Sequence, residues 1–205
     1  MWKEVLQANP DEFPRDVMEV IDYFRDPQPG EQVQAVPGAG LHVPIWILGS
    51  SLFGAQVAAA LGLPFSFASH FAPQLLHQAI DIYRERFTPS EHASKPNVML
   101  GVNIVAADTD ADARFLASSG RQSFASLRAG RPIALPPPSK AWERDSADKT
   151  DAANQRRVSF VGAPSTIKGQ IDEFVRATTA DELIAVAHIY DHAARLHSYE
   201  LAAAL

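Results

Sequence analysis

The sequence predicts an α/β fold built on a parallel sheet. Three apolar stretches, near residues 44–48, 64–71 and 97–109, have the composition of strands, and helical patterns of about a dozen residues separate them. Strands that alternate with helices in this way form parallel sheets, because each helix carries the chain back to the same end of the sheet. The third stretch is apolar on both faces, which is typical of a strand covered by helices.

An amphipathic helix is expected first, over residues 11–25. Its apolar residues recur at helical spacing and form one stripe: Phe13, Val17, Val20, Ile21 and Phe24. A breaker rich in proline at residues 26–30 ends this helix. Residues 31–43 are then expected to form a weak strand and a loop.

The stretch from residue 43 to residue 65 predicts a strand, a turn and a helix in direct succession. The strand runs from Pro44 to Leu48, and the helix carries Phe53, Val57 and Leu61 at helical spacing. The turn between them lies at the carboxyl end of a strand and at the amino end of a helix. Unpaired N–H groups and the helix dipole favour an anion at such a position.

Four small residues of this turn are candidates for binding a phosphate. Ser50 and Ser51 offer hydroxyl donors, while Gly49 and Gly54 would let a phosphate approach the backbone closely. The alternative is that Ser50 or Ser51 only caps the helix, as serines commonly do at this position. A phosphosugar-binding enzyme would present the same kind of turn, so the turn alone leaves the ligand open.

The rest of the chain continues the pattern of strands and helices within a single domain over residues 1–205. The second strand, in the sequence PFSFASHF, carries Ser69 and His70 at its carboxyl end. Helices are expected over residues 72–87, 110–130, 151–158, from Pro164 onward and over 191–205, with a last strand over 182–191. Residues 131–157, which contain three consecutive prolines, are expected to form a surface excursion.

Composition excludes several classes of function. The net charge is −6 and the basic residues are scattered, which argues against a nucleic-acid or membrane surface. With no cysteine there is no disulfide, thiol nucleophile or thiolate metal site. The amino end has no signal-peptide pattern and no apolar run spans a bilayer, so a cytoplasmic protein is expected.

The remaining histidines give weaker predictions. His188 lies in the last expected strand, where core packing is the favoured interpretation, and Asp191 is expected to cap the closing helix. His188 and His192 have the spacing of metal ligands on a helix, but no third ligand is in register, so no metal site is predicted. The sequence GSSLFG also lacks the nucleophile elbow of a serine hydrolase.

Several strings resemble the luciferase-like flavin monooxygenase family. They are PIWILGSSLFGAQVAAALGLPFSFASHFAP, NVMLGVNIVAADTDADAR, VGAPSTI and ADELIAVAHIYDHAARLHSYEL, and they occur in the family's order over nearly the whole chain. The resemblance implies a (β/α)8 barrel of the TIM type that binds reduced FMN, or in some branches deazaflavin F420, at the carboxyl ends of its strands. It also implies a flavin-dependent monooxygenase that uses O2 on a small organic substrate.

The resemblance implies roles for particular residues. The turn with Gly49, Ser50, Ser51 and Gly54 matches the positions that hold the flavin phosphate, although Gly54 replaces a threonine of many relatives and offers only its N–H. His70 matches a position beside the isoalloxazine ring, where a histidine can hydrogen-bond a flavin carbonyl or donate a proton. The alternative is a structural histidine bonded to the backbone.

The resemblance also implies that strands are missing. Family members are longer, and this chain shows about four confident strands where a closed barrel has eight. A partial barrel that lacks the amino-terminal strands is therefore expected, with unpaired strand edges that another chain or copy would cover. The expected partners are a flavin reductase and a second copy of the chain. The alternative function is a truncated, non-catalytic flavin-binding or structural remnant that needs a partner chain.

Overall fold

The computed structural model of the protein describes residues 12–145 and 158–205. The chain forms two compact units, which divide between Trp46 and Ile47. The helix expected over residues 151–158 and the end of the expected surface excursion lie outside the described residues. Whether the units act as the single domain expected from the sequence stays a prediction.

Within residues 12–46, the first unit contains one helix, α2 (Phe13–Phe24), close to the predicted bounds. The weak strand expected within residues 31–43 is wrong, because this segment forms turns and irregular structure. Of Val33 and Ala35, the alternating residues that suggested a strand, Val33 is 75% exposed and Ala35 is half-buried. The Ala39 N–H instead donates a hydrogen bond to the Ala35 carbonyl (2.7 Å) and closes a turn.

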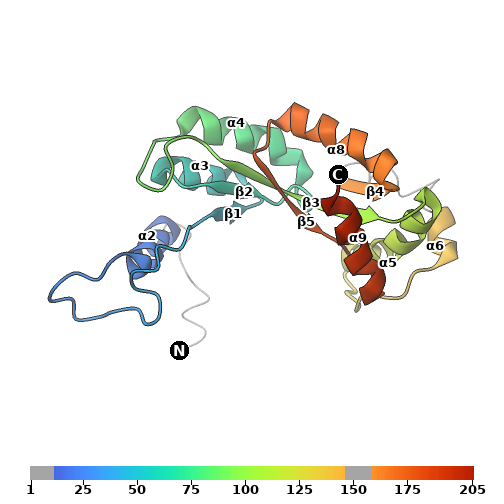
Figure 1. The fold of residues 1–205 in the computed structure, drawn as a ribbon, viewed down its shortest axis with the longest axis horizontal. Coiled ribbons are helices and arrows are strands. Elements are labelled where there is room, and N and C mark those ends of the chain that lie inside the picture. Colours follow the sequence, from blue (N-terminus) through green and yellow to red (C-terminus); the bar gives the residue numbers. More distant parts are fainter. Residues whose placement is uncertain (1–11, 146–157) are drawn as a thin grey trace. The chain divides into compact units, whose positions relative to one another are not determined.

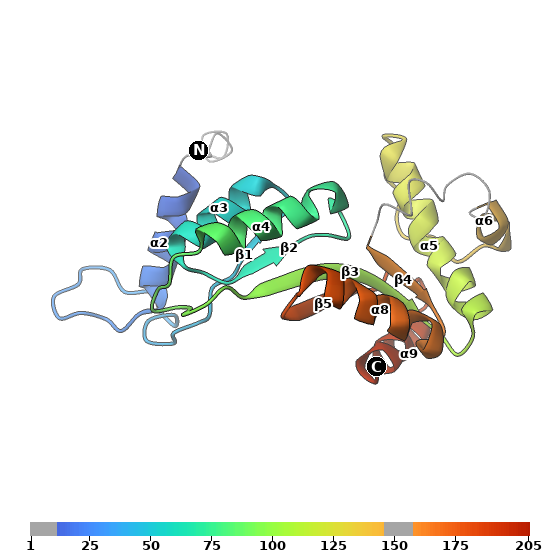
Figure 2. The same cartoon turned by 90° about the horizontal axis from the view of Figure 1, so that it is seen from above.

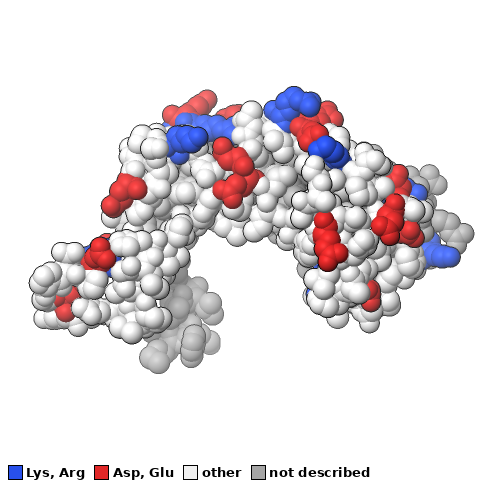
Figure 3. Space-filling view, in the orientation of Figure 1, with Lys and Arg blue, Asp and Glu red and all other residues white. Residues whose placement is uncertain are grey.

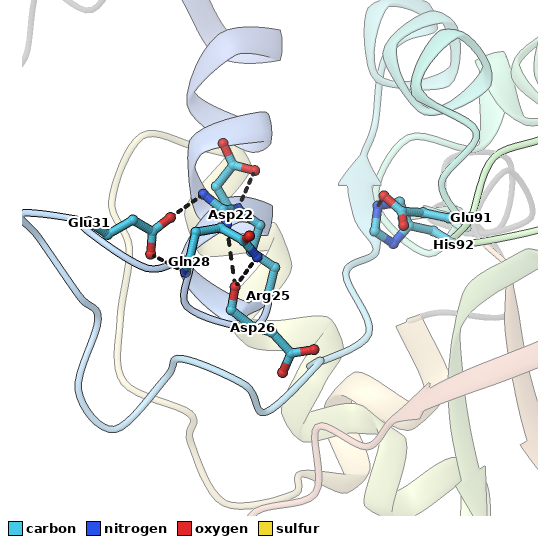
Figure 4. Close-up of polar contacts among 7 residues, drawn as sticks. All are labelled: Asp22, Arg25, Asp26, Gln28, Glu31, Glu91 and His92. Carbon is cyan, nitrogen blue, oxygen red and sulfur yellow. Dashed lines mark hydrogen bonds and ion pairs between the residues drawn. The ribbon is translucent and has the colours of Figure 1, made fainter.

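The chain just after α2 is held by the Arg25 guanidinium (Figure 4). Arg25 donates a hydrogen bond to the carboxylate of Glu31 and lies 3.4 Å from that of Asp22. The Gln28 N–H also donates to Glu31 (3.0 Å). The hydrogen bond from the Gln28 N–H is the largest cause that lowers the pKa of Glu31, and Arg25 lowers it further, because both stabilise the ionised carboxylate.

In the described residues, the second unit is built on a parallel sheet of five strands (Figure 1). These are β1 (Ile47–Gly49), β2 (Phe65–Phe67), β3 (Val98–Ala106), β4 (Ser159–Gly162) and β5 (Glu182–Val186). β1 pairs with β2, and β3 pairs with β2, β4 and β5, all in parallel. The predicted parallel α/β class is confirmed, although β4 was not predicted and β1 begins three residues later than expected.

β3 has three partners because two of them share one of its edges. The Gly101 carbonyl accepts a hydrogen bond from the chain just after β2 (2.9 Å), and the Asn103 N–H donates to Val158, just before β4 (3.0 Å). The Val98 carbonyl accepts instead from Asp181, just before β5 (2.9 Å). Alternate residues of a strand bond to opposite edges. β2 and β4 therefore follow one another along one edge of β3, and β5 occupies the other.

Helices connect the strands and cover mainly one face of the sheet. They are α3 (Leu52–Leu61), α4 (Leu76–Arg86), α5 (Asp110–Arg128), α6 (Lys140–Asp145), α8 (Pro164–Thr178) and α9 (His192–Ala203), with a 3₁₀ turn at Pro73–Leu75. Figures 1 and 2 show α3, α4 and α8 along the same side of the sheet. Within the described residues, every helix is too short or too polar to cross a bilayer.

The covered face of the sheet carries the hydrophobic core. Ile47, Phe65 and Phe67 are at most 3% exposed there. The ring of Tyr83, from α4, lies 5.3 Å from that of Phe65, and its hydroxyl donates to the Leu63 carbonyl (2.9 Å). In a second cluster, Val102, Ile104 and Phe160 of the sheet pack against Ile167 of α8 and against residues of α9. The charged side chains of α4 and α8 lie on the outer side of these helices (Figure 3).

The opposite face, here called the open face, has a different character. The strand register places these residues on it: Leu48, Ser66, Met99, Gly101, Asn103, Val105, Ser159, Val161, Glu182, Ile184 and Val186. Leu48 is 68% exposed and Ile184 is 50% exposed. Further along β3, α5 covers the sheet, where Ala117 packs with Val105 and Ile189.

Candidate functional site

The predicted phosphate-binding turn lies at the amino end of α3. Gly49 ends β1, Ser50 is half-buried, and Ser51 is the exposed N-cap residue with an extended backbone (φ −133°, ψ 166°). The Ser51 hydroxyl makes no capping hydrogen bond to α3. The capping alternative therefore does not hold for Ser51. Gly54 is buried in the first turn of the helix.

Two other helices, α5 and α9, use their N-cap side chains, whereas α2, α4 and α8 also lack a side-chain cap. Thr109 Oγ1 accepts a hydrogen bond from the Asp112 N–H at the start of α5 (3.1 Å). Asp191 accepts one from the Ala194 N–H at the start of α9 (2.8 Å), as the sequence predicted. The amino end of α3 has neither such a cap nor an acidic residue in its first turn. Its N–H groups and the two serine hydroxyls form a donor set that fits a phosphate.

Packing within the protein does not by itself require glycine in this turn. A Cβ atom at Gly49 would lie 3.6 Å from the Cα of Gly54, which is an ordinary contact distance. Gly49 and Gly54 carry no side chain, so a phosphate can approach the backbone closely at these two positions.

His70 follows β2, the strand next to β1, at the same end of the sheet, where the carboxyl ends of the parallel strands lie. β1 and β2 are parallel and in register, and the Ala68 N–H continues their pairing by donating to the Gly49 carbonyl (2.9 Å). The turn with Ser50 and the loop with His70 therefore both follow carboxyl ends of adjacent strands. Tyr190, 55% exposed, follows the carboxyl end of β5, which is parallel to them.

The His70 loop is fixed on β3 at Gly101. Ser69 Oγ and the His70 N–H both donate to the Gly101 carbonyl, at 2.6 and 2.9 Å. A Cβ at Gly101 would lie 2.5 Å from the Nδ1 of His70. The imidazole therefore rests on the open face directly over Gly101, and only glycine at this strand position leaves room for it. Both the functional and the structural interpretation of His70 remain consistent with this contact.

A second polar group on the open face was missed by the sequence analysis. Asn103 lies two residues beyond Gly101 on the same face of β3. Its amide donates to Ser159 Oγ (2.7 Å), and its Oδ1 lies 3.4 Å from the Nδ1 of His188. The expectation of core packing for His188 is wrong, because β5 ends at Val186 and the His188 side chain is exposed. The signal available in the sequence was the asparagine itself, since it interrupts an otherwise apolar strand.

His192 is engaged differently. The Arg195 guanidinium donates to its Nδ1 (2.8 Å), within the first turn of α9. In the part of the chain that the structure describes, no group of three or more histidine, aspartate or glutamate side chains is arranged to hold a metal ion. The candidate site within the described residues comprises the α3 turn, His70 over Gly101, and the Asn103–His188 pair.

The family of the chain follows from comparison with known proteins. The model of a family described as luciferase-like monooxygenase matches residues 2–182. The chain belongs to the luciferase-like monooxygenase family. The parallel α/β fold and the position of the turn at the carboxyl ends of the strands agree with such a barrel.

Two bacterial relatives illustrate the similarity within the luciferase-like monooxygenases. The chain is 45% identical over 199 residues to a protein of Escherichia coli K12 named luciferase-like monooxygenase, and 40% identical over 196 residues to the uncharacterized protein YvbT of Bacillus subtilis. These matches cover 96% and 94% of this chain but 59% and 58% of the relatives. The chain therefore spans about three fifths of the length of the curated relatives it matches.

Solved structures support the same fold. The crystal structure of apo-MsnO8 matches with a TM-score of 0.82 at 31% identity, covering 96% of this chain and 60% of that one. The monooxygenase RslO1 of Streptomyces bottropensis matches with a TM-score of 0.60 at 18% identity, covering 98% and 63%, which shows the fold alone. The partial barrel expected from the sequence is consistent with this coverage.

Proposed function

We propose that the chain anchors a reduced FMN and belongs to a flavin-dependent monooxygenase that acts with O2 on a small organic substrate. The observation that carries the proposal is the amino end of α3, where Ser51 makes no capping bond and two serine hydroxyls accompany the first-turn N–H groups. Membership of the luciferase-like monooxygenases supports monooxygenation as the reaction class. FMN is proposed over F420, which stays the alternative cofactor.

Each residue of the site has a part in this proposal. Ser50, Ser51 and the first-turn N–H groups of α3 would bind the FMN phosphate, because donors and the helix dipole converge there, and Gly49 and Gly54 would let the phosphate approach closely. His70 would lie beside the ring system, held in place by its contact with Gly101. When bound, reduced flavin supplies the electrons for activating O2. A reductase that delivers reduced flavin and a second copy of the chain are the proposed partners.

The alternative is a non-catalytic role, in which the chain binds flavin or completes a barrel together with another polypeptide. The exposed Leu48 and Ile184 on the open face favour this alternative, because exposed apolar side chains are typical of a surface that another polypeptide covers. Light scattering on the purified chain separates the two. A compact monomer that unfolds cooperatively argues against the need for a partner.

Titration of oxidised and reduced FMN against riboflavin tests the phosphate anchor. Riboflavin has the same ring system without the phosphate, so anchoring predicts tighter binding of FMN. Replacing both Ser50 and Ser51 by alanine should abolish most of this preference. The matched control is Ser165→Ala, an exposed serine in the first turn of α8. Equal binding of FMN and riboflavin by the unaltered chain would contradict the anchor.

A further inference from the structure

Four strands in the described part of the second unit lie side by side in one row. The order across the sheet is β1, β2, β3 and β5, and neighbouring strands are parallel. β4 does not lengthen the row, because it pairs with β3 beyond β2 and along the same edge. The helices α3, α4 and α8 cover one face of the row (Figures 1 and 2). Four parallel strands with helices on one face are half of what closes a (β/α)8 barrel.

Each end of this row has an outer edge that can pair with a further strand. The Ile47 N–H donates to the chain just before β2 (3.0 Å), so the next residue, Leu48, directs its backbone groups away from β2. The Asp181 N–H donates to β3 (2.9 Å), so alternate residues of β5, Ile184 among them, direct theirs away from β3. Within residues 12–145 and 158–205, the sheet contains no strand beyond β1 or beyond β5.

The sequences at these two edges are typical of interior strands. β1 is ILG and β5 is ELIAV, and neither contains a lysine or a proline. Exposed edge strands of natural sheets often carry such residues, which hinder pairing with another chain. The charged residue of β5, Glu182, is its first, and an apolar run follows it, as in parallel strands that are covered on both faces. Leu48 and Ile184 are nevertheless 68% and 50% exposed in the single chain. The two edges and the open face therefore suit a partner that supplies parallel strands.

A second copy of the chain supplies both of the edges that are needed. A two-fold axis along the strands keeps every strand parallel, and it brings β1 of each copy beside β5 of the other. Two rows of four strands make eight, the number in a closed (β/α)8 barrel. Both seams are identical, so the assembly closes as a dimer without a free edge in the row. This closure favours a second copy over an unrelated chain, because the two edges of one chain complement each other.

We propose that two copies of the chain pair β1 with β5 and close an eight-stranded parallel barrel. The proposal deepens the proposed function, in which a second copy is a partner, and it rests on that partner and not on the flavin. The open faces of the two copies form the barrel interior, which buries Leu48 and Ile184. The α3 turn and the His70 loop of each copy follow carboxyl ends of strands, so they lie at one mouth of the barrel. Each copy thereby closes the mouth opposite the anchor turn of the other.

Cysteine cross-linking tests the seam, because the chain contains no cysteine of its own. A Leu48→Cys chain is coexpressed in turn with Glu182→Cys, Ile184→Cys and Val186→Cys chains and then oxidised mildly. These three positions of β5 lie on one face in steps of about 7 Å. A disulfide needs Cα atoms about 4.4–6.8 Å apart, so one register should link and the others should not.

Leu48→Cys alone should form no disulfide, because the two copies of β1 lie on opposite sides of the barrel. The control is a Gln56→Cys chain coexpressed with the same β5 variants, since Gln56 is exposed on α3. A seam that links in none of the three combinations overturns the proposal. Links between two copies of Leu48→Cys, or equal linking in the Gln56 control, overturn it as well.

Light scattering on the full 205-residue chain tests closure without any substitution. The mass should be twice the 22.3 kDa of one chain. A monomer overturns the proposal and leaves both edges to another polypeptide, and a series of larger oligomers overturns the closure. Leu48→Lys should abolish the dimer, because it buries a charge in the barrel, whereas Gln56→Lys should leave the dimer intact.

Leu48→Ala is the milder test if the lysine variant fails to fold. Leu48 is solvated in the single chain and buried in the barrel. Leu48→Ala should therefore cost little at concentrations where the chain is monomeric, but raise the dissociation constant of the dimer at least about tenfold. An unchanged dissociation constant overturns the burial of the open face.

Titration of FMN and riboflavin on the same samples separates the barrel from the flavin anchor. A dimer that binds FMN and riboflavin equally leaves the barrel standing and rejects the anchor. A monomer that prefers FMN leaves the anchor standing and overturns the barrel. The two proposals can thus fail independently.

Discussion

The two faces of the sheet are built from the same strands but differ in what they do. On the covered face, Ile47 is 3% exposed and packs beneath α3. On the open face, its neighbour Leu48 is 68% exposed. The covered face is filled with large apolar side chains, whereas the open face carries glycine, asparagine and the histidines that contact them. The covered face therefore carries the packing that stabilises the sheet, and we propose that ligand binding belongs to the open face.

The largest expected effect is the difference in stability between alanine substitutions at Ile47 and at Leu48. Ile47→Ala should destabilise the chain by about 2–5 kcal/mol, because it leaves a cavity in a packed core. Leu48→Ala should change stability by less than about 0.5 kcal/mol, because the side chain is mostly solvated. Urea denaturation of both variants measures the contrast. A cost above about 2 kcal/mol for Leu48→Ala would show that the open face is covered in solution.

The next effect concerns the contact between Gly101 and His70. Gly101→Ala should destabilise by about 1–3 kcal/mol, since the new methyl group displaces the imidazole. Gly169→Ala is the control, because the methyl group added to this glycine of α8 would meet open space and alanine favours helices by about 1 kcal/mol. Thermal unfolding should thus shift in opposite directions. A neutral Gly101→Ala variant with an unmoved His70 resonance would refute the contact.

A smaller effect compares two N-cap positions. Thr109→Ala should cost about 1 kcal/mol, because its hydroxyl caps α5. Ser51→Ala should cost only a few tenths of a kcal/mol, because its hydroxyl does not cap α3. The same Ser51 variant should lose affinity for FMN, measured by fluorescence titration. Equal destabilisation by both variants would contradict this and show that the Ser51 hydroxyl caps α3.

The smallest expected effect is the pH dependence that arises from His197. A hydrogen bond with the Asp108 carboxylate (3.0 Å) raises the pKa of His197 above its ordinary value of 6.5, and Glu200 adds to this. The charged ring is therefore favoured in the folded chain. Its contribution to stability is complete below the ordinary pKa and is lost as the pH rises through the raised one. Urea midpoints measured from about pH 5 to about pH 9 should show this decline in the unaltered chain and not in His197→Gln.

The sequence predicted the elements with long periodic patterns. α2, α3, α5 and α8 occur close to their expected bounds, because their apolar residues recur at helical spacing in the sequence. β4 was missed because four residues are too few to show a hydrophobic period, and because its partner strand β3 lies far away in the chain. The strand expected near Val33 was wrong because an isolated alternating segment needs a neighbouring strand to pair with.

The candidate site was predictable where it depends on local geometry. The turn with Ser50 and Ser51 was found because a strand, small residues and a helix follow one another in the sequence. The Asn103–His188 pair was missed because its members are 85 residues apart and meet only through strand pairing. For the same reason, the close contact of His70 with Gly101 had no counterpart in the sequence pattern.

The arrangement of β3 has a consequence for the order in which the protein assembles. The Val98 N–H donates to the carboxylate of Asp181, 83 residues later in the chain. During synthesis this edge of β3 has no β5 to pair with until the ribosome has made the whole of that interval. Distant pairings of this kind slow folding, because a long loop must close before any contact forms. During translation of this interval the nascent chain therefore carries an unpaired strand edge, which can pair with the wrong partner.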